Sequence, residues 1–186
     1  LTLSFLGASL CTVMISCDNT SKPEDSEEVA EEHNEAKFDN KEETDAAFLV
    51  AAAGINLEEI QLGKLAQTNS ANSDVKALGA MMESEHSKVL KELQALAAKK
   101  QITLPNTLTE DGQEAYDKLV KKTNAEFDEE YCEMMVNGHK KAIDKFEMAS
   151  KNTSDSDIRN WANSTIPSLR KHLDHSISCQ QKCEKM

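Results

Sequence analysis

The sequence contains few of the residues that interrupt helices or mark strand-rich folds. Its 186 residues include six glycines, three prolines and one tryptophan, and aromatic residues make up 4% of the chain. No stretch alternates apolar and polar residues as a half-buried strand does; apolar residues instead recur at spacings of three and four. These absences argue against a strand-rich fold and predict an all-α protein.

The patterns of several enzyme and binding classes are also missing. The chain has no glycine-rich loop that would cradle a phosphate, no nucleophile dyad and no paired carboxylates of a hydrolase. Nucleic-acid binding needs a basic surface, whereas the formal net charge here is −12. We therefore expect no nucleic-acid partner, and a non-enzymatic role is favoured. The sequence indicates neither a protein partner nor an oligomeric state.

The first residues, LTLSFLGASLCTVMISC (1–17), are apolar and lead to Cys17. They are too few for a permanent transmembrane helix, which needs roughly 20 apolar residues, and they resemble the apolar core of a secretory signal peptide. The ending MISC resembles the lipobox of bacterial lipoproteins, so Cys17 is predicted to be lipidated and to begin the mature chain. An uncleaved anchor or an ordinary signal peptide is the alternative. We expect attachment to a membrane of the bacterial cell envelope, the outer membrane being favoured, with the protein facing the periplasm or the cell surface.

The next segment, residues 18–45, is strongly acidic. It holds twelve Asp or Glu against three Lys, a net charge of −9, and almost no large apolar side chains. Such a segment cannot bury enough apolar surface to offset the entropy lost on ordering. The sequence therefore predicts a disordered tether over 18–43, a single domain over 44–178 and a Cys-containing tail over 179–186.

Within the domain, apolar residues recur at helical spacing in five stretches separated by polar turns. The stretches that predict long helices are 44–69, 75–104, 123–151 and 158–178. A shorter helix is expected over 112–122, between the second and third. Long helices joined by short turns form an antiparallel four-helix bundle, whose core requires neither a metal nor a disulfide to fold.

Three cysteines lie outside the apolar start, an odd number for an oxidising compartment. Cys179 and Cys183 are four residues apart, where a strained disulfide could form at a frayed end. Cys132 would then be a free, buried thiol. Together with His175, the two C-terminal cysteines could bind a metal, but an exposed amphipathic tail is the simpler explanation.

Four polar residues interrupt the apolar faces of the long helices, one on each: Glu59, His86, His139 and His172. Counting along antiparallel helices predicts that they share a layer near the middle of the bundle, with His172 displaced by about a turn. One carboxylate and three imidazoles would suit Zn, Cu or Fe. The favoured alternative is a hydrogen-bonded polar layer that fixes the helix register.

Methionines stand one helical turn before two of these histidines, Met82 before His86 and Met135 before His139. The repeated spacing would suit copper, which accepts soft sulfur ligands. Methionine also fills irregular gaps in any core. Met135 is therefore only a secondary candidate ligand.

A ferritin-type di-iron site is only half present. Such a site needs Glu-x-x-His on each of two helices. Glu83 and His86 have this spacing, but Leu169 stands where the acid before His172 should be. Glu83 and its neighbour Glu85 remain secondary candidates for metal ligands.

Several motifs resemble a bacterial envelope family, the domain of unknown function number four-one-four-two. They are LGKLA, the acid–His pair Glu85–His86, FD..Y....V..H over 127–139 and P.L..H over 167–172, within a resemblance that covers about 44–178. The family commonly has Asp where Glu85 stands. The resemblance implies a ferritin-like fold and an envelope location but no particular reaction.

Residues 127–149 also look like the Mi.HH..A helix of a copper-associated periplasmic helical family, except that Gly138 replaces the first histidine. The leading functional hypothesis is a binding or structural role in the cell envelope, with a link to stress tolerance. The alternative is metal binding through the inward-facing histidines and Glu59. A ferritin-like redox enzyme is less favoured.

Overall fold

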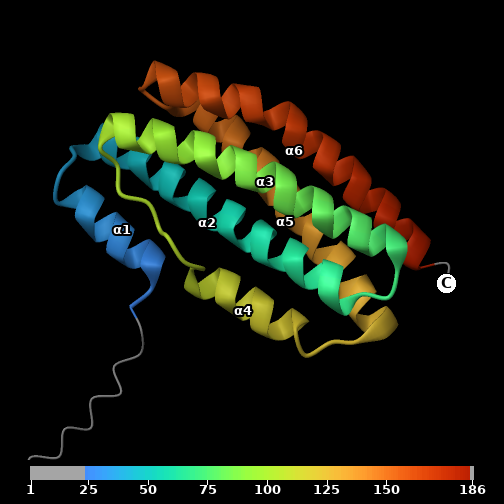
Figure 1. The fold of residues 1–186 in the computed structure, drawn as a ribbon. Coiled ribbons are helices and arrows are strands. Elements are labelled where there is room, and N and C mark those ends of the chain that lie inside the picture. The colour runs from blue at the N-terminus through green and yellow to red at the C-terminus, as the bar shows by residue number, and fades with distance from the viewer. Residues whose placement is uncertain (1–23, 185–186) are drawn as a thin grey trace, which may run out of the picture.

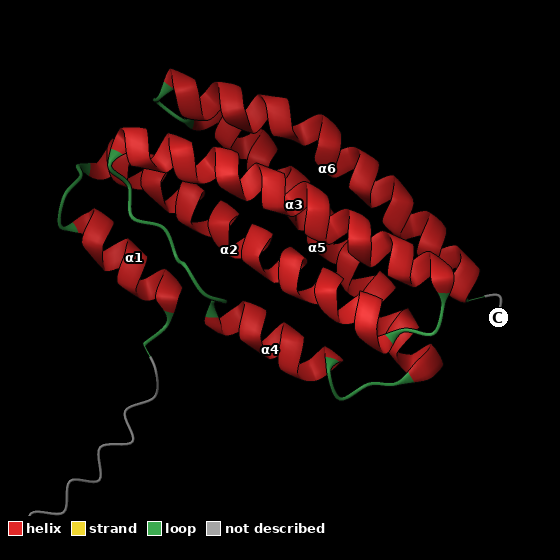
Figure 2. Ribbon diagram, viewed as in Figure 1, coloured by secondary structure: helices red, strands yellow, loops and turns green. Residues whose placement is uncertain are grey.

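The computed structural model describes residues 24–184, in which the chain forms six helices and no strand (Figures 1 and 2). The predicted all-α fold is confirmed. The predictions for the apolar start and for lipidation of Cys17 lie outside the described residues. The helices are α1 (Ser26–Glu35), α2 (Asn40–Asn69), α3 (Ser73–Lys100), α4 (Glu110–Leu119), α5 (Asn124–Asn152) and α6 (Ser156–Cys183).

The four long helices lie side by side as two helical hairpins (Figure 1). α2 packs against α3 and α5 packs against α6, and the hairpins meet where α2 contacts α5 and α3 contacts α6. The short α4 is the additional helix expected between the second and third long helices, and it lies with α1 on the outer side of α2. By length and composition α2 is apolar enough to cross a membrane, but 61% of its apolar window is buried within the bundle. It is the core helix of this fold.

α2 and α3 approach closely at a pair of glycines. A Cβ on Gly79 would lie 2.6 Å from the carbonyl oxygen of Gly63 and 2.8 Å from Cβ of Ala66. Both distances are shorter than carbon can tolerate, so the helices touch through their backbones only because side chains are missing there. This contact sets the spacing of the first hairpin.

The turn between α5 and α6 is held by a buried carboxylate of α2. Asp45 accepts hydrogen bonds from the hydroxyl groups of Thr153 and Ser154 and from the backbone N–H of Asp155. Asp155 in turn caps α6, because its side chain accepts from the backbone N–H groups of Asp157 and Ile158. One side chain thus joins the second hairpin to the first.

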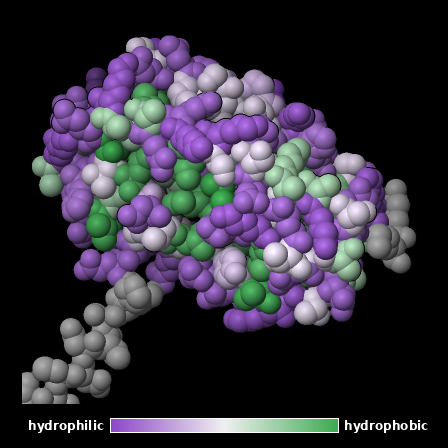
Figure 3. All heavy atoms as spheres, viewed as in Figure 1, coloured by the Kyte–Doolittle hydropathy of each residue, from purple (hydrophilic) through white to green (hydrophobic). Residues whose placement is uncertain are grey.

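The core consists of two apolar clusters with a polar layer between them. Polar and charged side chains cover most of the face drawn in Figure 3, with apolar atoms visible between them. One cluster lies near the α2–α3 turn and includes Leu62, Val75, Met82, Phe127 and Tyr131. The other lies toward the opposite end and includes Leu49, Leu93, Phe146, Ile158 and Trp161.

The prediction of a disordered tether over 18–43 is wrong for its described part. Residues 26–35 form α1, and α2 begins at Asn40 rather than near Thr44. Ala30 and Asn34 of α1 are buried, and the Asn34 amide exchanges two hydrogen bonds with the backbone of Thr103, of 2.9 Å and 2.8 Å. Contacts with the α3–α4 connection hold this acidic segment in place, and its composition does not reveal them.

The prediction of a separate tail over 179–186 is also wrong for its described residues, 179–184. α6 continues to Cys183, and Cys179 and Cys183 are buried with exposures of 5% and 9%. Both are free thiols packed near Cys132, so no disulfide joins them. The expected exposed amphipathic tail is not present in this segment, because His175 is exposed but the two cysteines are buried.

Candidate metal centre

Three histidines from three helices converge between the two apolar clusters. His86 of α3, His139 of α5 and His172 of α6 are 1%, 1% and 2% exposed. Their ring centroids are 5.1 to 5.4 Å apart, and one nitrogen from each lies within 4.8 Å of the others. The three histidines of the predicted layer therefore converge, and His172 is as close as the other two and is not displaced by a turn. Glu59, the fourth predicted member, is not among the converging donors.

Asn56 of α2 fixes the tautomer of His86. Its amide nitrogen donates to the carbonyl oxygen of Ala52 at 2.7 Å, which turns its Oδ1 toward Nδ1 of His86 at 3.0 Å. Since Oδ1 can only accept, Nδ1 of His86 carries the proton. The lone pair of His86 is therefore on Nε2.

The tautomer of His139 is fixed in the same way. Its Nδ1 lies 2.8 Å from the carbonyl oxygen of Met135 and 3.5 Å from Oε1 of Glu59. With the Met135 carbonyl as its near partner, Nδ1 carries the proton and Nε2 has the lone pair. Met135, a secondary candidate for a sulfur ligand, thus contacts His139 through its backbone carbonyl oxygen.

The two lone pairs face each other. Nε2 of His86 and Nε2 of His139 are 3.3 Å apart, yet neither carries a proton that could join them. Nδ1 of His172 is buried and has no hydrogen-bond partner among the described residues. Imidazoles that bind metals are oriented as His86 and His139 are: one ring nitrogen faces the ion, and the other donates to a carbonyl or carboxylate oxygen. Nitrogens held by one tetrahedral ion lie about 3.3 Å apart, so the observed spacing fits a cation.

The family model described as Domain of unknown function (DUF4142) matches residues 29–178. The chain belongs to the DUF4142 family. The match begins within α1, which agrees with the packing of α1 onto the domain. No curated protein matches this DUF4142 chain.

A solved structure with a similar fold is that of CopM in the Cu(II)-bound form. The TM-score is 0.62 at 17% sequence identity, and the match covers 74% of this chain and 96% of that chain. At this identity the likeness shows that the DUF4142 chain shares the helical fold of CopM.

Burial keeps the histidines of this DUF4142 protein neutral. Burial lowers the pKa of His139 and of His172 to about 4 and that of His86 well below its ordinary value. Burial also raises the pKa of Glu59 to about 8. At neutral pH the four groups are therefore mainly uncharged, and the imidazole lone pairs are available to a cation.

The secondary acidic candidates do not join the histidines. Glu83 accepts a hydrogen bond of 2.7 Å from the side-chain amide of Gln67 on α2. Glu85 pairs with Lys88 at 2.7 Å, with 41% of its side chain exposed. Neither carboxylate belongs to the converging group of donors among the described residues. The ferritin-type pair of Glu83 and His86 is therefore not assembled.

A hollow of about 440 Å³ reaches Glu59 from the surface between α2 and α5. Glu58, Gly138 and Lys141 help to line it. A Cβ on Gly138 would lie 3.3 Å from Oε1 of Glu59, so the glycine leaves room for the carboxylate. The position at which Gly138 replaces a histidine of the copper-associated pattern is thus next to Glu59.

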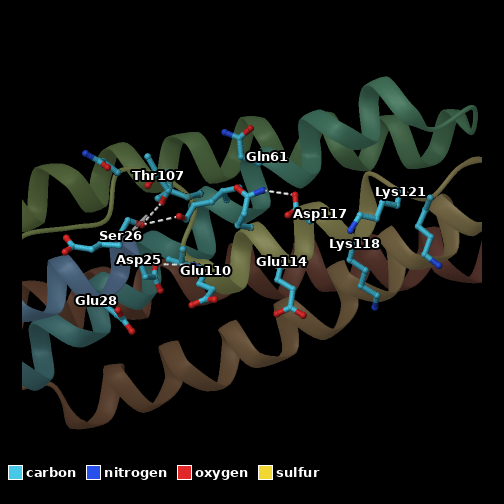
Figure 4. A pocket seen from close by; sticks show the side chains of 17 residues that line it. Asp25, Ser26, Glu28, Gln61, Thr107, Glu110, Glu114, Asp117, Lys118 and Lys121 are labelled. Carbon is cyan, nitrogen blue, oxygen red and sulfur yellow. Dashed lines mark hydrogen bonds between the residues drawn. The ribbon is translucent and has the colours of Figure 1, made fainter. Parts of the chain in front are cut away.

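A larger hollow of about 1560 Å³ lies among α1, α2 and α4 (Figure 4). Charged residues of both signs, such as Glu110, Glu114 and Lys118, line it, and no histidine does. It is larger than the hollow beside Glu59, but none of the described residues that line it belongs to a converging group of possible metal ligands. The candidate site of this DUF4142 protein is therefore the histidine layer.

Proposed function

We propose that this protein binds a transition-metal ion, copper in the first place, through His86, His139 and His172, with Glu59 beside them. The observation that supports this most is the pair of Nε2 atoms that face each other at 3.3 Å with their lone pairs. Asn56 and the Met135 carbonyl maintain that orientation. A bound ion would supply the positive charge that two such lone pairs attract.

A hydrogen-bonded layer that only fixes helix register is the competing interpretation, and the layer satisfies its own polar atoms poorly. Buried polar groups of native proteins nearly always have a hydrogen-bond partner. Here Oε2 of Glu59 and Nδ1 of His172 are buried without one among the described residues. The contact between the two Nε2 atoms lacks a proton as well. These features favour the metal-binding alternative over a purely structural role.

Copper is favoured over other ions for two reasons. Imidazole sites bind Zn, Fe, Ni and Cu, and divalent copper has the highest affinity for a given set of donors. The chain also shares its fold with CopM, whose solved structure is the Cu(II)-bound form. We propose that the protein acts in the cell envelope, anchored through Cys17, because the MISC ending and the apolar residues before it are typical of a lipoprotein. Its role there would be to hold the ion rather than to catalyse a reaction.

The test is a metal titration of purified protein without a His tag. Wild-type protein should bind one equivalent of Cu(II) in competition with a chelator, and should be stabilised by about 2.7 kcal/mol at a free metal concentration of about 100 times Kd. His139→Ala should lose both effects. His175→Ala is the matched control, because His175 is an exposed histidine on α6. Equal binding by wild type and His139→Ala, with both folded by circular dichroism, would overturn the proposal.

A further inference from the structure

A second group of possible metal ligands lies nearer the α2–α3 turn than the histidine layer does. Cys132 of α5 faces Cys179 and Cys183 of α6, which are one helical turn apart on the same face. Sγ of Cys132 is 3.3 Å from Sγ of Cys179 and 3.9 Å from Sγ of Cys183. All three thiols are free, buried and within 4.8 Å of one another.

This group is separate from the histidine layer. Cys179 follows His172 by seven residues on α6, which corresponds to about 10 Å along the helix. The neighbours also differ, because the thiols lie in the apolar cluster with Val75, Leu78 and Tyr131. At the outer side, the amide nitrogen of Asn72 lies 3.8 Å from Sγ of Cys183, so the group is close to the α2–α3 turn.

We propose that Cys132, Cys179 and Cys183 form a thiolate site for a single thiophilic metal ion, Cu(I) in the first place. Thiolates are soft ligands that select Cu(I) or Zn(II) over harder ions. Three sulfurs around one ion, each about 2.3 Å away, are separated by about 4 Å. The observed separations of 3.3 Å and 3.9 Å are already near that value.

The number of donors distinguishes between the two ions. No carboxylate or imidazole of the described residues joins the three sulfurs within the same radius. Structural Zn(II) sites use four protein ligands, whereas Cu(I) is satisfied by three thiolates. Each thiol that binds releases one proton as its Cu–S bond forms, and neither sulfur nor copper changes oxidation state.

Burial alone does not account for this arrangement. A buried free cysteine commonly serves as a small apolar side chain. One such residue needs no partner of its own kind, but here three sulfurs from two helices meet at one point. The other outcome open to the group is a disulfide between Cys132 and Cys179, the pair with the shorter separation.

The test is a titration of the full, reduced chain with Cu(I) under anaerobic conditions, in competition with bicinchoninate. The protein should bind one equivalent in this site, and X-ray absorption at the copper edge should show sulfur neighbours. Cys132→Ser and Cys183→Ser should each lose that equivalent, whereas His139→Ala should keep it. The second cysteine variant is at the most exposed of the three positions, so it tests the site even if Cys132→Ser does not fold.

Three results would overturn the proposal. They are retention of the sulfur-bound equivalent by both cysteine variants, displacement of Cu(I) by equimolar Zn(II), and a Cys132–Cys179 disulfide in protein isolated without added reductant. Loss of Cu(II) binding in His139→Ala with unchanged Cu(I) binding would leave this site intact. Failure of the histidine site and failure of the cysteine site are therefore distinguishable.

Discussion

Replacing Glu59 by glutamine should change how the stability of the metal-free protein depends on pH. Burial raises the pKa of this carboxyl group from its ordinary 4.5 to about 8. Between these values the folded protein keeps a proton that the unfolded chain has released. The contribution of Glu59 to stability is thus complete below about pH 4.5 and is lost as the pH rises toward 8.

The size of the effect follows from the shift. One pKa unit corresponds to about 1.4 kcal/mol, so the full loss is up to about 5 kcal/mol. The depressed pKa values of the histidines have the opposite effect on stability. The contribution of the neutral histidines to the stability of the folded protein is lost as the pH falls from about 6.5 toward 4. Wild type and Glu59→Gln share those histidines, so the difference between the two proteins isolates Glu59.

The assay is urea unfolding of metal-free protein, followed by far-ultraviolet circular dichroism at several pH values between 5 and 8. Glu59→Gln should gain several kcal/mol relative to wild type over this range, while Nδ1 of His139 still donates to the carbonyl oxygen of Met135. Glu92→Gln is the matched control at an exposed position of α3 and should follow wild type. Parallel stability profiles for wild type and Glu59→Gln would refute the argument that Glu59 is protonated in the core.

Three further substitutions test the site and its supports. Asn56→Leu removes the acceptor that orients His86 and should weaken metal binding about 10- to 100-fold in a competition titration, with the helical content unchanged; unchanged affinity would contradict the assigned tautomer. Gly79→Ala forces a Cβ against the backbone of Gly63 and should cost about 1–3 kcal/mol in chemical unfolding; a neutral result would mean that the hairpin can open there without loss. Asp45→Ala leaves the donors of the α5–α6 turn without an acceptor and should also cost about 1–3 kcal/mol, and an unchanged melting temperature would show that the turn does not depend on α2.

Helical periodicity predicted the histidine layer because each polar residue interrupts a sustained apolar stripe. Glu59, His86, His139 and His172 are all buried, as their positions on those stripes require. The expected axial displacement of His172 was wrong because residue counts along separate helices do not fix their relative heights. Those heights depend on packing, such as the close contact between Gly63 and Gly79.

The groups that orient the histidines were not predictable in the same way. Asn56 is three residues before Glu59, and its position on the apolar face was the available signal. The role of the Met135 carbonyl depends on a rotamer of His139, which no sequence pattern specifies. Cys132 is 47 residues from Cys179, and their contact follows only once α6 is known to continue to Cys183.

The acidic segment shows the limit of arguments from composition. Its charge correctly indicates poor hydrophobic burial, but α1 is held by specific contacts instead. Asn34 pairs with the backbone of Thr103, and the Ser26 hydroxyl donates to the carbonyl oxygens of Thr107 and Leu108. These partners lie more than 65 residues away in sequence, so the local sequence pattern of the acidic segment cannot predict these contacts.

The central claim is that the histidine layer binds a metal, and anomalous diffraction at the copper edge tests it most directly. Crystals of the copper-loaded protein should show an anomalous peak within the bundle, between Nε2 of His86 and Nε2 of His139 and beside His172. Copper only at surface residues, with the two Nε2 atoms still 3.3 Å apart and nothing between them, would contradict the account.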